Sequence, residues 1–422
     1  MDKKIKVGLI GLGTVGSGVF KTLRNFDEIE VSKIAVKNIN KKRDIEGLET
    51  SMLTDNAYEI VNNPEIDIVA ELVGGIEPAF DLISTAIKNG KHIVTANKEL
   101  LAKCGEDIFK LAEKYNRVIL YEAAIAGGIP IIMPVKTILA GNDITHIEAI
   151  LNGTTNYILT KMDIQKASYA DVLKEAQELG YAEADPTGDV EGFDAAYKIA
   201  TLASITFNKR IDIKKVYREG ITKIRAKDME AANDLGYKIK LIASANIDEN
   251  DNADVRVHPM LVSKKSTLAH IDYVTNAVML KGHPVGSITL SGPGAGEFPT
   301  ASSVVGDILA IAAEIGKSDY ILPMMRCKHN SAAHMLDISE TTNKYYISIH
   351  ANNNKGVIGK IGTICADNDI SLASIVQKCV SEDNTADITV ITELVKEKNM
   401  QNAIKLIEKD GNIVENLIRV QV

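Results

Sequence analysis

The chain has 422 residues, of which 45% are hydrophobic and 25% are charged, a composition typical of globular proteins that bury several cores. The formal net charge of −8 argues against nucleic acid or an anionic membrane surface as the main partner, because both require a basic face on the protein. No apolar stretch reaches membrane-spanning length, and the four cysteines are scattered without metal-ligand spacing. We therefore expect a cytoplasmic protein with no disulfide framework and no zinc site.

Residues 1–130 alternate short apolar runs with helical patterns. The expected strands are "IKVGLIG", "VSKIAVKN", "IDIVAELVGG", "HIVTAN" and "VILYEAA". The expected helices run through Val19 and Leu23, from Pro78 to Asn89, and through Leu100 to Tyr115. Repeated βαβ units predict a parallel sheet that helices cover on both faces. The sequence therefore predicts an α/β protein with a Rossmann-type, doubly wound domain over 1–130.

A glycine-rich motif follows the first expected strand directly. The motif has the GxGxxG pattern and consists of Gly11, Leu12, Gly13, Thr14, Val15 and Gly16. Glycines at these positions permit a tight turn and let backbone N–H groups approach a pyrophosphate at the start of a helix. A turn with purely structural glycines is the alternative. A strand before the motif and a helix after it favour a nicotinamide dinucleotide site.

The end of the second expected strand indicates which nicotinamide cofactor the site prefers. NAD sites usually carry Asp or Glu there, whereas this chain has Lys37 and Asn38, with Lys41, Lys42 and Arg43 close behind. A basic pocket suits the additional 2′-phosphate of NADP. We therefore expect NADP, with NAD as the second possibility. The alternative is that these side chains only solvate a loop.

Two further features of this region lie where open α/β sheets bind ligands. In "VTANKELLAK", Lys98 comes just past the carboxyl end of an expected parallel strand. Its alternative role is that of a surface lysine at the start of a helix. In "LYEAAIAGGIP", Gly127 and Gly128 bend the chain, which suits either a close approach to a ligand or ion, or a plain turn before Pro130.

Residues 131–340 form the second expected domain, of the α+β type. Helices are expected near 156–163, 168–179 and 191–206, and the strands that follow are "YKIKLIASANI", "ADVRVHPMLV", "YVTNAVMLKG" and "VGSITLSG". Ser168 and Asp171 resemble a capping box, and we interpret His258 as structural. A second glycine-rich run precedes a helix near 299–317. We expect the run to close over the cofactor and the helix to pack back on the first domain; the alternative is a hairpin exit followed by an N-capped helix. The glycines of the run are Gly292, Gly294 and Gly296.

An acidic loop leads into the expected helix over 191–206. The acidic residues are Glu183, Asp185, Asp189, Glu191 and Asp194. They are more numerous than helix capping requires, and such a cluster could hold the ammonium group of an amino-acid substrate. Asp194 precedes Lys198 by four residues, so both side chains lie on one helix face. The pair is either a surface salt bridge or an acid that positions an active-site amine.

The remainder of the chain is expected to form a smaller module. The tetrapeptide "TTNK" over 341–344 is interpreted as a polar linker. Over 345–422 the strands "YYISIHA", "LASIVQKCV", "ADITVITELV" and "IVENLIRVQV" combine with two expected helices. The helices run from Val357 to Asn368 and through Met400 to Glu408. The order βαββαβ predicts a ferredoxin-like module.

These motifs together resemble those of a known family, over essentially the whole length of the chain. The segments "GLGTVGSGV", "VTANKELLA", "YEAAIAGGIPI", "LNGTTNYIL", "GYAEADPTGDVEGFDAAYKIA" and "GPGAGEFPTASSVVGDI" are similar to those of homoserine dehydrogenases that carry a C-terminal ACT domain. The resemblance implies an oxidoreductase that reduces L-aspartate 4-semialdehyde to L-homoserine with NAD(P)H, in the biosynthesis of threonine, methionine and isoleucine. It also implies an ACT regulatory domain over 345–422.

The resemblance further implies roles for individual residues. Lys198 would donate a proton to the aldehyde oxygen, Asp194 would orient Lys198, and Lys98 would contact substrate and cofactor. Glu183 would bind the homoserine amine. Other residues implied to line the substrate or cofactor site are Asp189, Gly180 and Gly296. A monovalent cation such as sodium would lie at Glu122, Ile125, Gly127 and Ile129, mostly on carbonyl oxygens.

Regulation and assembly are also expected from the resemblance. ACT domains typically bind small amino acids at a turn resembling D-x-P-G-V-L; here residues 353–358 keep Gly356 but lack the Asp and the Pro. We expect threonine to act as effector there; the alternative is a module that serves only dimerisation. A homodimer or homotetramer is expected. Two other functions remain open: a different NAD(P)-dependent amino-acid dehydrogenase, and a non-catalytic regulator that binds NADPH and an amino acid.

Overall fold

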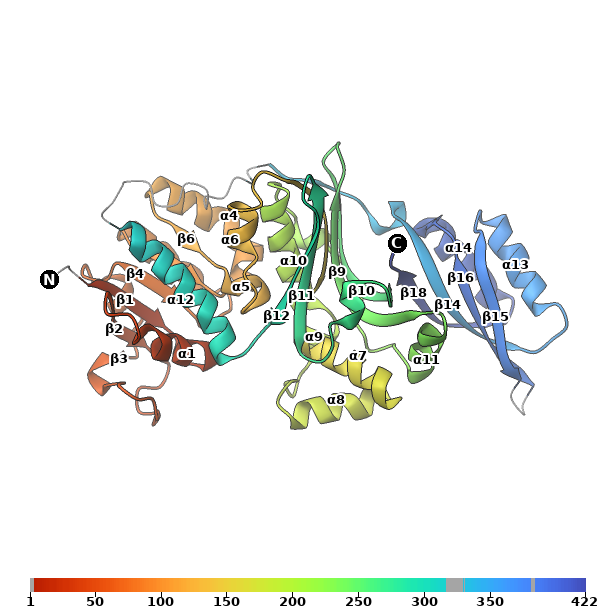
Figure 1. Cartoon of the computed structure of the whole chain (residues 1–422), viewed down its shortest axis with the longest axis horizontal. Coiled ribbons are helices and arrows are strands. Elements are labelled where there is room, and N and C mark those ends of the chain that lie inside the picture. The colour runs from red at the N-terminus through yellow and green to blue at the C-terminus, as the bar shows by residue number, and fades with distance from the viewer. Residues whose placement is uncertain (1–3, 316–328, 330, 381–383) are drawn as a thin grey trace. The chain divides into compact units, whose positions relative to one another are not determined.

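The computed structural model describes residues 4–315, 329, 331–380 and 384–422 (Figure 1). The chain forms two compact units, each of which combines segments that are distant in sequence. The first unit comprises Met1–Ile147, Tyr197–Ile213 and Thr275–Ala333. The second unit comprises Glu148–Ala196, Lys214–Val274 and His334–Val422. No helix in the described part of the chain is both long and apolar enough to cross a membrane.

A six-stranded parallel sheet forms the centre of the first unit and confirms the predicted doubly wound fold. Its strand order is β3-β2-β1-β4-β5-β6. The strands are β1 (Ile5–Ile10), β2 (Ile29–Ala35), β3 (Leu53–Thr54), β4 (Ile68–Glu71), β5 (His92–Thr95) and β6 (Ile119–Leu120). The helices between them are α1 (Thr14–Leu23), α2 (Tyr58–Val61), α3 (Ala79–Lys88) and α4 (Lys98–Lys114). Strands β1, β4 and β5 are buried almost throughout, as expected for a sheet covered on both faces.

A later segment of the chain completes the first unit. Helix α12 (Glu297–Glu314) lies against α1, where Gly18 leaves no room for a Cβ atom: it would stand 2.7 Å from the carbonyl oxygen of Glu297. The Nζ of Lys21 also lies 2.7 Å from the Glu297 carboxylate. Strands β11 (Thr275–His283) and β12 (Gly286–Pro293) form an antiparallel hairpin beside β7 (Asp143–Ile150), a strand that the sequence analysis missed.

The prediction of a strand over "VILYEAA" was wrong in its second half. Strand β6 ends at Leu120, and the alanine-rich residues Ala123–Ala126 form the short helix α5. Alanine has the highest helix propensity, which outweighs the apolar run. Gly127, with φ of 60°, ends this helix, and α6 (Ile132–Lys136) follows.

The second unit is built on one continuous sheet. Within it the strand order is β9-β10-β18-β14-β16-β15. The strands are β9 (Tyr237–Ile247), β10 (Asn252–Ser263), β14 (Thr342–Asn352), β15 (Leu372–Val380), β16 (Thr385–Thr392) and β18 (Ile413–Val420). The short strands β8 (Tyr217–Arg218), β13 (His334–Met335) and β17 (Val395–Lys396) pair at its margins. The helices are α7 (Gly153–Gln165), α8 (Tyr169–Glu178), α9 (Thr187–Val190), α11 (Ala226–Asp234), α13 (Val357–Asp367) and α14 (Glu397–Lys409).

The C-terminal module has the predicted βαββαβ order, β14-α13-β15-β16-α14-β18 with the small β17 added. Strand β18 pairs in parallel with β10, Met260 opposite Arg419 and Leu261 opposite Val420. The module therefore continues the sheet of the second unit.

The interpretation of "TTNK" as a linker was wrong. Strand β14 begins at Thr342, and Thr341 and Asn343 are each only 5% exposed. The amide of Asn343 donates to the Thr341 hydroxyl and to the phenol oxygen of Tyr345. Polar residues thus occupy a buried position because their hydrogen bonds are satisfied within the fold.

Candidate active site

The glycine motif lies between β1 and α1, as its sequence pattern predicts. Gly11 has φ of +105°, and a Cβ atom on Gly16 would stand 2.2 Å from the Gly11 carbonyl oxygen, so both positions require glycine. Gly13, the N-cap residue of α1, has open space around its Cβ position and provides no side-chain cap. The first N–H groups of α1 are therefore available to a phosphate. The arrangement fits a dinucleotide.

Lys98 begins helix α4 directly after β5. Strands β1, β4 and β5 are parallel neighbours, so the glycine motif and Lys98 follow the carboxyl ends of strands about 10 Å apart in the same sheet. Open α/β sheets bind ligands at this edge. Lys37 lies exposed beyond the end of β2, at the same edge.

Residues that the sequence analysis did not single out fix this edge. Glu71, fully buried at the end of β4, accepts hydrogen bonds from the Thr95 hydroxyl at 2.7 Å and from the backbone N–H groups of Val73 and Gly74. Asn97 caps α4, and its amide donates to the carbonyl of Gly75 at 2.6 Å. A buried acid at a strand end was visible in "IDIVAELVGG", but its partner Thr95 lies on another strand.

The second glycine-rich run packs against the turn at Gly127. A Cβ atom on Gly127 would stand 2.2 Å from the carbonyl oxygen of Gly294, and the N–H of Gly128 donates to the Pro293 carbonyl at 3.1 Å. Gly296, with φ of +117°, is the N-cap residue of α12. The Gly127 carbonyl accepts from the hydroxyl of Ser303 at 2.6 Å. Two glycine-rich segments far apart in sequence thus meet within the first unit.

Glu122, the candidate cation ligand, has an unexpected role. Its buried carboxylate accepts the backbone N–H groups of Ile131, Ile132 and Met133 and so caps the start of α6. Its own N–H donates at 2.8 Å to Asp307, which is 3% exposed. Burial raises the pKa of Glu122, although the three backbone N–H donors lower it. Burial also raises the pKa of Asp307 well above its usual range. The other candidate ligands, Ile125 and Ile129, are buried in the same turn.

In the second unit, Asn152 brings two of the predicted acids together. Its side-chain nitrogen donates to the Asp189 carboxylate at 2.6 Å and to the Asp194 carboxylate at 3.1 Å. Its oxygen accepts the N–H of Thr155 at 2.9 Å and caps α7. Asn152 and Asp194 are 6% and 8% exposed. Sequence reasoning missed Asn152, although it lies in the quoted segment "LNGTTNYIL".

Helix α10 (Phe193–Thr206) carries both Asp194 and Lys198. Their spacing of four residues places them on one helix face. Gly192, at φ of +78°, allows the sharp entry into this helix, and Gly180, at φ of +76°, ends α8. Glu183 lies exposed in the loop between them, with its carbonyl accepting from the Gln177 amide.

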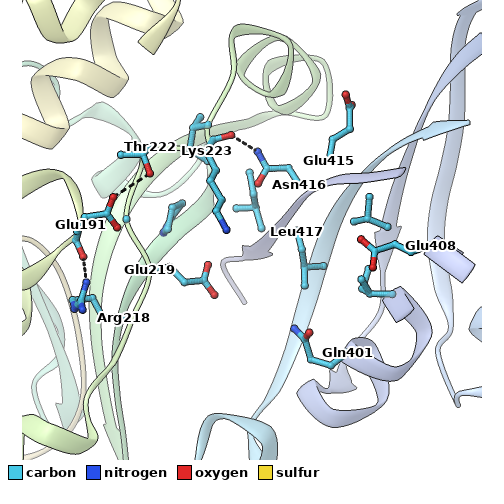
Figure 2. A pocket seen from close by; sticks show the side chains of 16 residues that line it. Glu191, Arg218, Glu219, Thr222, Lys223, Gln401, Glu408, Glu415, Asn416 and Leu417 are labelled. Atoms are coloured by element: carbon cyan, nitrogen blue, oxygen red, sulfur yellow. Dashed lines mark hydrogen bonds between the residues drawn. The ribbon is translucent and has the colours of Figure 1, made fainter. Parts of the chain in front are cut away.

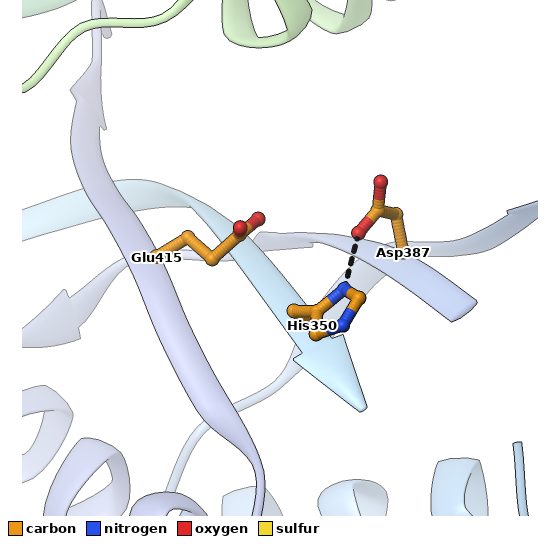
Figure 3. Close-up of side chains that lie close together, drawn as sticks. All are labelled: His350, Asp387 and Glu415. Carbon is orange, nitrogen blue, oxygen red and sulfur yellow. Dashed lines mark hydrogen bonds and ion pairs between the residues drawn. The ribbon is translucent and has the colours of Figure 1, made fainter. Parts of the chain in front are cut away.

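A group of side chains with metal-ligand chemistry lies elsewhere, on the sheet of the C-terminal module (Figure 3). His350 Nδ1 is 3.0 Å from Asp387, and Glu415 lies beside both. The ammonium group of Lys227 already stands 2.5 Å from Glu415 and 3.5 Å from Asp387, and Arg225 is 2.7 Å from Glu415. The cluster is therefore an ion-pair network between α11 and the sheet.

Comparison with known proteins shows which family this chain resembles. The family model for the NAD-binding domain of homoserine dehydrogenase matches residues 11–122, the homoserine dehydrogenase model matches 130–309, and the ACT domain model matches 345–412. A homoserine dehydrogenase of Synechocystis sp. is 41% identical over 431 residues, with 99% of each chain covered. The chain belongs to the homoserine dehydrogenase family. Members of this family are NAD(P)-dependent oxidoreductases that act on a CH–OH group.

Solved structures show the same relationship. A homoserine dehydrogenase from Thiobacillus denitrificans has a TM-score of 0.94 and 41% identity, with 99% of this chain and 98% of that chain covered. A hyperthermophilic archaeal homoserine dehydrogenase mutant in complex with NADPH has a TM-score of 0.63 and 26% identity over 74% of this chain and 98% of that one. The fold and the ACT domain expected from the sequence are thereby confirmed.

Proposed function

We propose that the protein catalyses the reversible reduction of L-aspartate 4-semialdehyde to L-homoserine, in the biosynthesis of threonine, methionine and isoleucine. Family membership over the full chain supports this reaction. The observation that carries it is the contact of Asn152 with both Asp189 and Asp194, because Asp194 lies in the first turn of the helix that bears Lys198.

Lys198 is the proton donor in this proposal. The reduced nicotinamide, when bound, supplies the hydride to the carbonyl carbon. Negative charge then develops on the oxygen, where a lysine ammonium stabilises it and transfers a proton. Asp194 favours the charged amine and fixes its direction, because Asn152 holds the carboxylate itself.

Substrate recognition uses lysine and acidic side chains. Lys98 contacts substrate and cofactor, Glu183 binds the homoserine ammonium group, and Asp189 lines the substrate site. The backbone at Gly180 completes the substrate site. An acidic set suits an ammonium group because charge-assisted hydrogen bonds are about twice as strong as neutral ones.

The cofactor is NADP in preference to NAD. Residues 11–16 and the backbone at Gly296 hold it, and the exposed Lys37 binds the 2′-phosphate. The NADPH in the archaeal relative supports a nicotinamide cofactor of this type.

A monovalent cation such as sodium is held at Glu122, Ile125, Gly127 and Ile129, mostly by carbonyl oxygens. Burial raises the pKa of Glu122 and of Asp307, and a bound cation in this region would favour the charged forms of both acids.

Regulation and assembly complete the proposal. Threonine inhibits the enzyme through the ACT domain, at the turn over 353–358, where Gly356 adopts φ of +90°. The protein is a cytoplasmic homodimer or homotetramer, for which the edge strands β12 and β15 offer pairing surfaces.

The decisive experiment is homoserine oxidation by the pure protein with NADP and with NAD, followed by absorbance of the reduced nicotinamide. We expect turnover with homoserine and faster turnover with NADP. Oxidation of an α-amino acid at its α-carbon without homoserine turnover would overturn the proposal in favour of an amino-acid dehydrogenase. Cofactor binding without any turnover would indicate a regulator.

A further inference from the structure

A cavity of about 430 Å³ lies in the second unit, where the ACT module meets the segment 218–224 (Figure 2). One wall consists of that segment and Glu191, and the other of α14 and β18. Both walls belong to the same compact unit. The volume is sufficient for one free amino acid.

Both walls of the cavity carry acidic side chains, and the first wall also carries the basic side chains of Arg218 and Lys223. Lys223 extends into the space between the walls, whereas Glu408 projects from α14 on the far side (Figure 2). Within the described part of the chain, neither side chain has a charged partner, although nearby Lys227 and Arg225 are both paired with Glu415. The backbone carbonyl of Lys223 accepts a hydrogen bond from the Asn416 amide at 3.0 Å.

Apolar side chains form the floor between these charges. Ile404 of α14 and Leu417 of β18 line the cavity and belong to the edge of the module's hydrophobic core. An unpaired ammonium, an unpaired carboxylate and an apolar surface together match a zwitterion with a small hydrocarbon side chain.

The same cavity touches the loop that precedes α10. Arg218 donates to the carbonyl of Glu191 at 2.6 Å, and its guanidinium lies 3.4 Å from the centre of the Phe193 ring. The Thr222 hydroxyl donates to the Glu191 carboxylate at 3.1 Å, and the N–H of Ile221 donates to the carbonyl of Val190 at 2.9 Å. The cavity wall and the start of the helix bearing Asp194 are thus braced together.

We propose that this cavity binds a free L-α-amino acid as a regulatory site separate from the turn over 353–358. The ligand carboxylate pairs with the Lys223 ammonium, the ligand ammonium pairs with Glu408, and its side chain rests on Ile404 and Leu417. Because the ligand contacts both walls, its affinity depends on their spacing, and its binding shifts the loop before α10. The inference rests on the proposed function only in that the regulated activity is the homoserine oxidation.

The test is calorimetric titration of the full-length protein with L-threonine and with L-isoleucine. We expect Lys223→Met and Glu408→Gln each to raise the Kd about tenfold or more, since each removes a charge-assisted hydrogen bond. Lys405→Met is the matched control, because it removes an exposed charge of α14 that does not line the cavity. L-Threoninamide and N-acetyl-L-threonine, which each lack one charge, should bind weakly to the wild type.

Three outcomes would overturn the proposal: neither amino acid binds, the two variants bind like the Lys405→Met control, or only Asn354→Ala in the turn abolishes binding. Homoserine oxidation without effector is measured on every variant. If the wild type does not oxidise homoserine but its amino-acid binding depends on Lys223, the proposed function is wrong and the proposed regulatory site is supported. If the activity is normal and binding is absent, the site fails alone.

Discussion

At the scale of single residues, the pair on α10 makes the most direct prediction. Lys198→Met is expected to lower kcat by about two or more decades, because general-acid assistance is worth roughly 10² to 10⁴. Asp194→Asn should lower it similarly through misorientation of the amine. NADPH affinity, measured by fluorescence titration, should stay nearly unchanged in both variants. Near-normal turnover of Lys198→Met would mean that Asp194 and Lys198 form only a salt bridge and have no catalytic role.

Asn152 makes a second prediction, which separates its two hydrogen-bonding roles. Asn152→Ser keeps a good N-cap for α7 but removes the amide that links Asp189 and Asp194. We expect kcat to fall about tenfold or more while the melting temperature changes little, because an unfixed carboxylate no longer positions Lys198. Ser168→Ala, which removes the cap of α8, is the control: about 1 kcal/mol less stable, with normal kcat. Normal kcat in Asn152→Ser would limit Asn152 to capping.

Sequence reasoning reached some of these residues and not others for a physical reason. Asp194 and Lys198 were visible because helix periodicity relates positions four apart. Asn152 acts on partners 37 and 42 residues away, and no local pattern encodes that distance. Glu122 was named through family resemblance, but its role as the cap of α6 depends on a turn geometry that the sequence does not display.

Lys37 gives a third prediction, on cofactor choice. Lys37→Ala should raise the KM for NADPH at least several-fold and leave that for NADH nearly unchanged, since only NADPH carries the 2′-phosphate. Lys88→Ala, at the far end of α3, serves as the charge-matched control. Equal effects on both cofactors would show that Lys37 only solvates its loop.

At the scale of elements, strand β5 carries a buried histidine whose titration should appear in stability. Burial, and then the charge of Arg117, lowers the pKa of His92 to about 4, and its Nδ1 accepts the N–H of Val118 at 3.2 Å. Between pH 6.5 and 4 the unfolded chain therefore binds more protons at this histidine than the folded protein does. The stability that the neutral His92 contributes is complete above pH 6.5 and lost below pH 4. The loss amounts to about 3 kcal/mol at most.

The measurement is urea unfolding at pH 7 and at pH 5. His92→Gln should show a smaller loss of stability between these values than the wild type, whereas the exposed His283→Gln should behave like the wild type. An unchanged pH dependence in His92→Gln would mean that other buried groups, such as His258 in β10, dominate.

Element prediction succeeded where periodicity and burial agreed. "YKIKLIASANI" coincides with β9 and "LASIVQKCV" with β15. The failures were short or polar: β7 begins with exposed Asp143, buried Ile144 and exposed Thr145, and "TTNK" is polar although Thr341 and Asn343 are buried. Such segments take their structure from partners that come later in the chain.

At the scale of the whole molecule, the C-terminal module is joined to the rest of the second unit by buried charge. Arg419 of β18, 1% exposed, donates at 2.8 Å both to Glu397 of α14 and to Glu219, which follows β8. Tyr345 donates to the same Glu397. Removing the module from residue 341 onward would therefore remove β18 from beside β10 and leave Glu219 without its cation Arg419. Point variants, rather than truncation, are the sound way to separate regulation from folding.

Arg419 makes the last prediction. Arg419→Met should destabilise the protein by about 3–5 kcal/mol, because it leaves Glu397 buried without its cation. The double variant Arg419→Met/Glu397→Met should be less destabilised than the sum of the two single variants, since the second change removes the stranded charge. Urea unfolding measures all three, and Arg24→Met on the exposed end of α1 should cost little. If the losses of stability of the two single variants add up strictly, the C-terminal module is held to the rest of the second unit by sheet pairing and apolar contact. The ion pair would then contribute nothing to the stability.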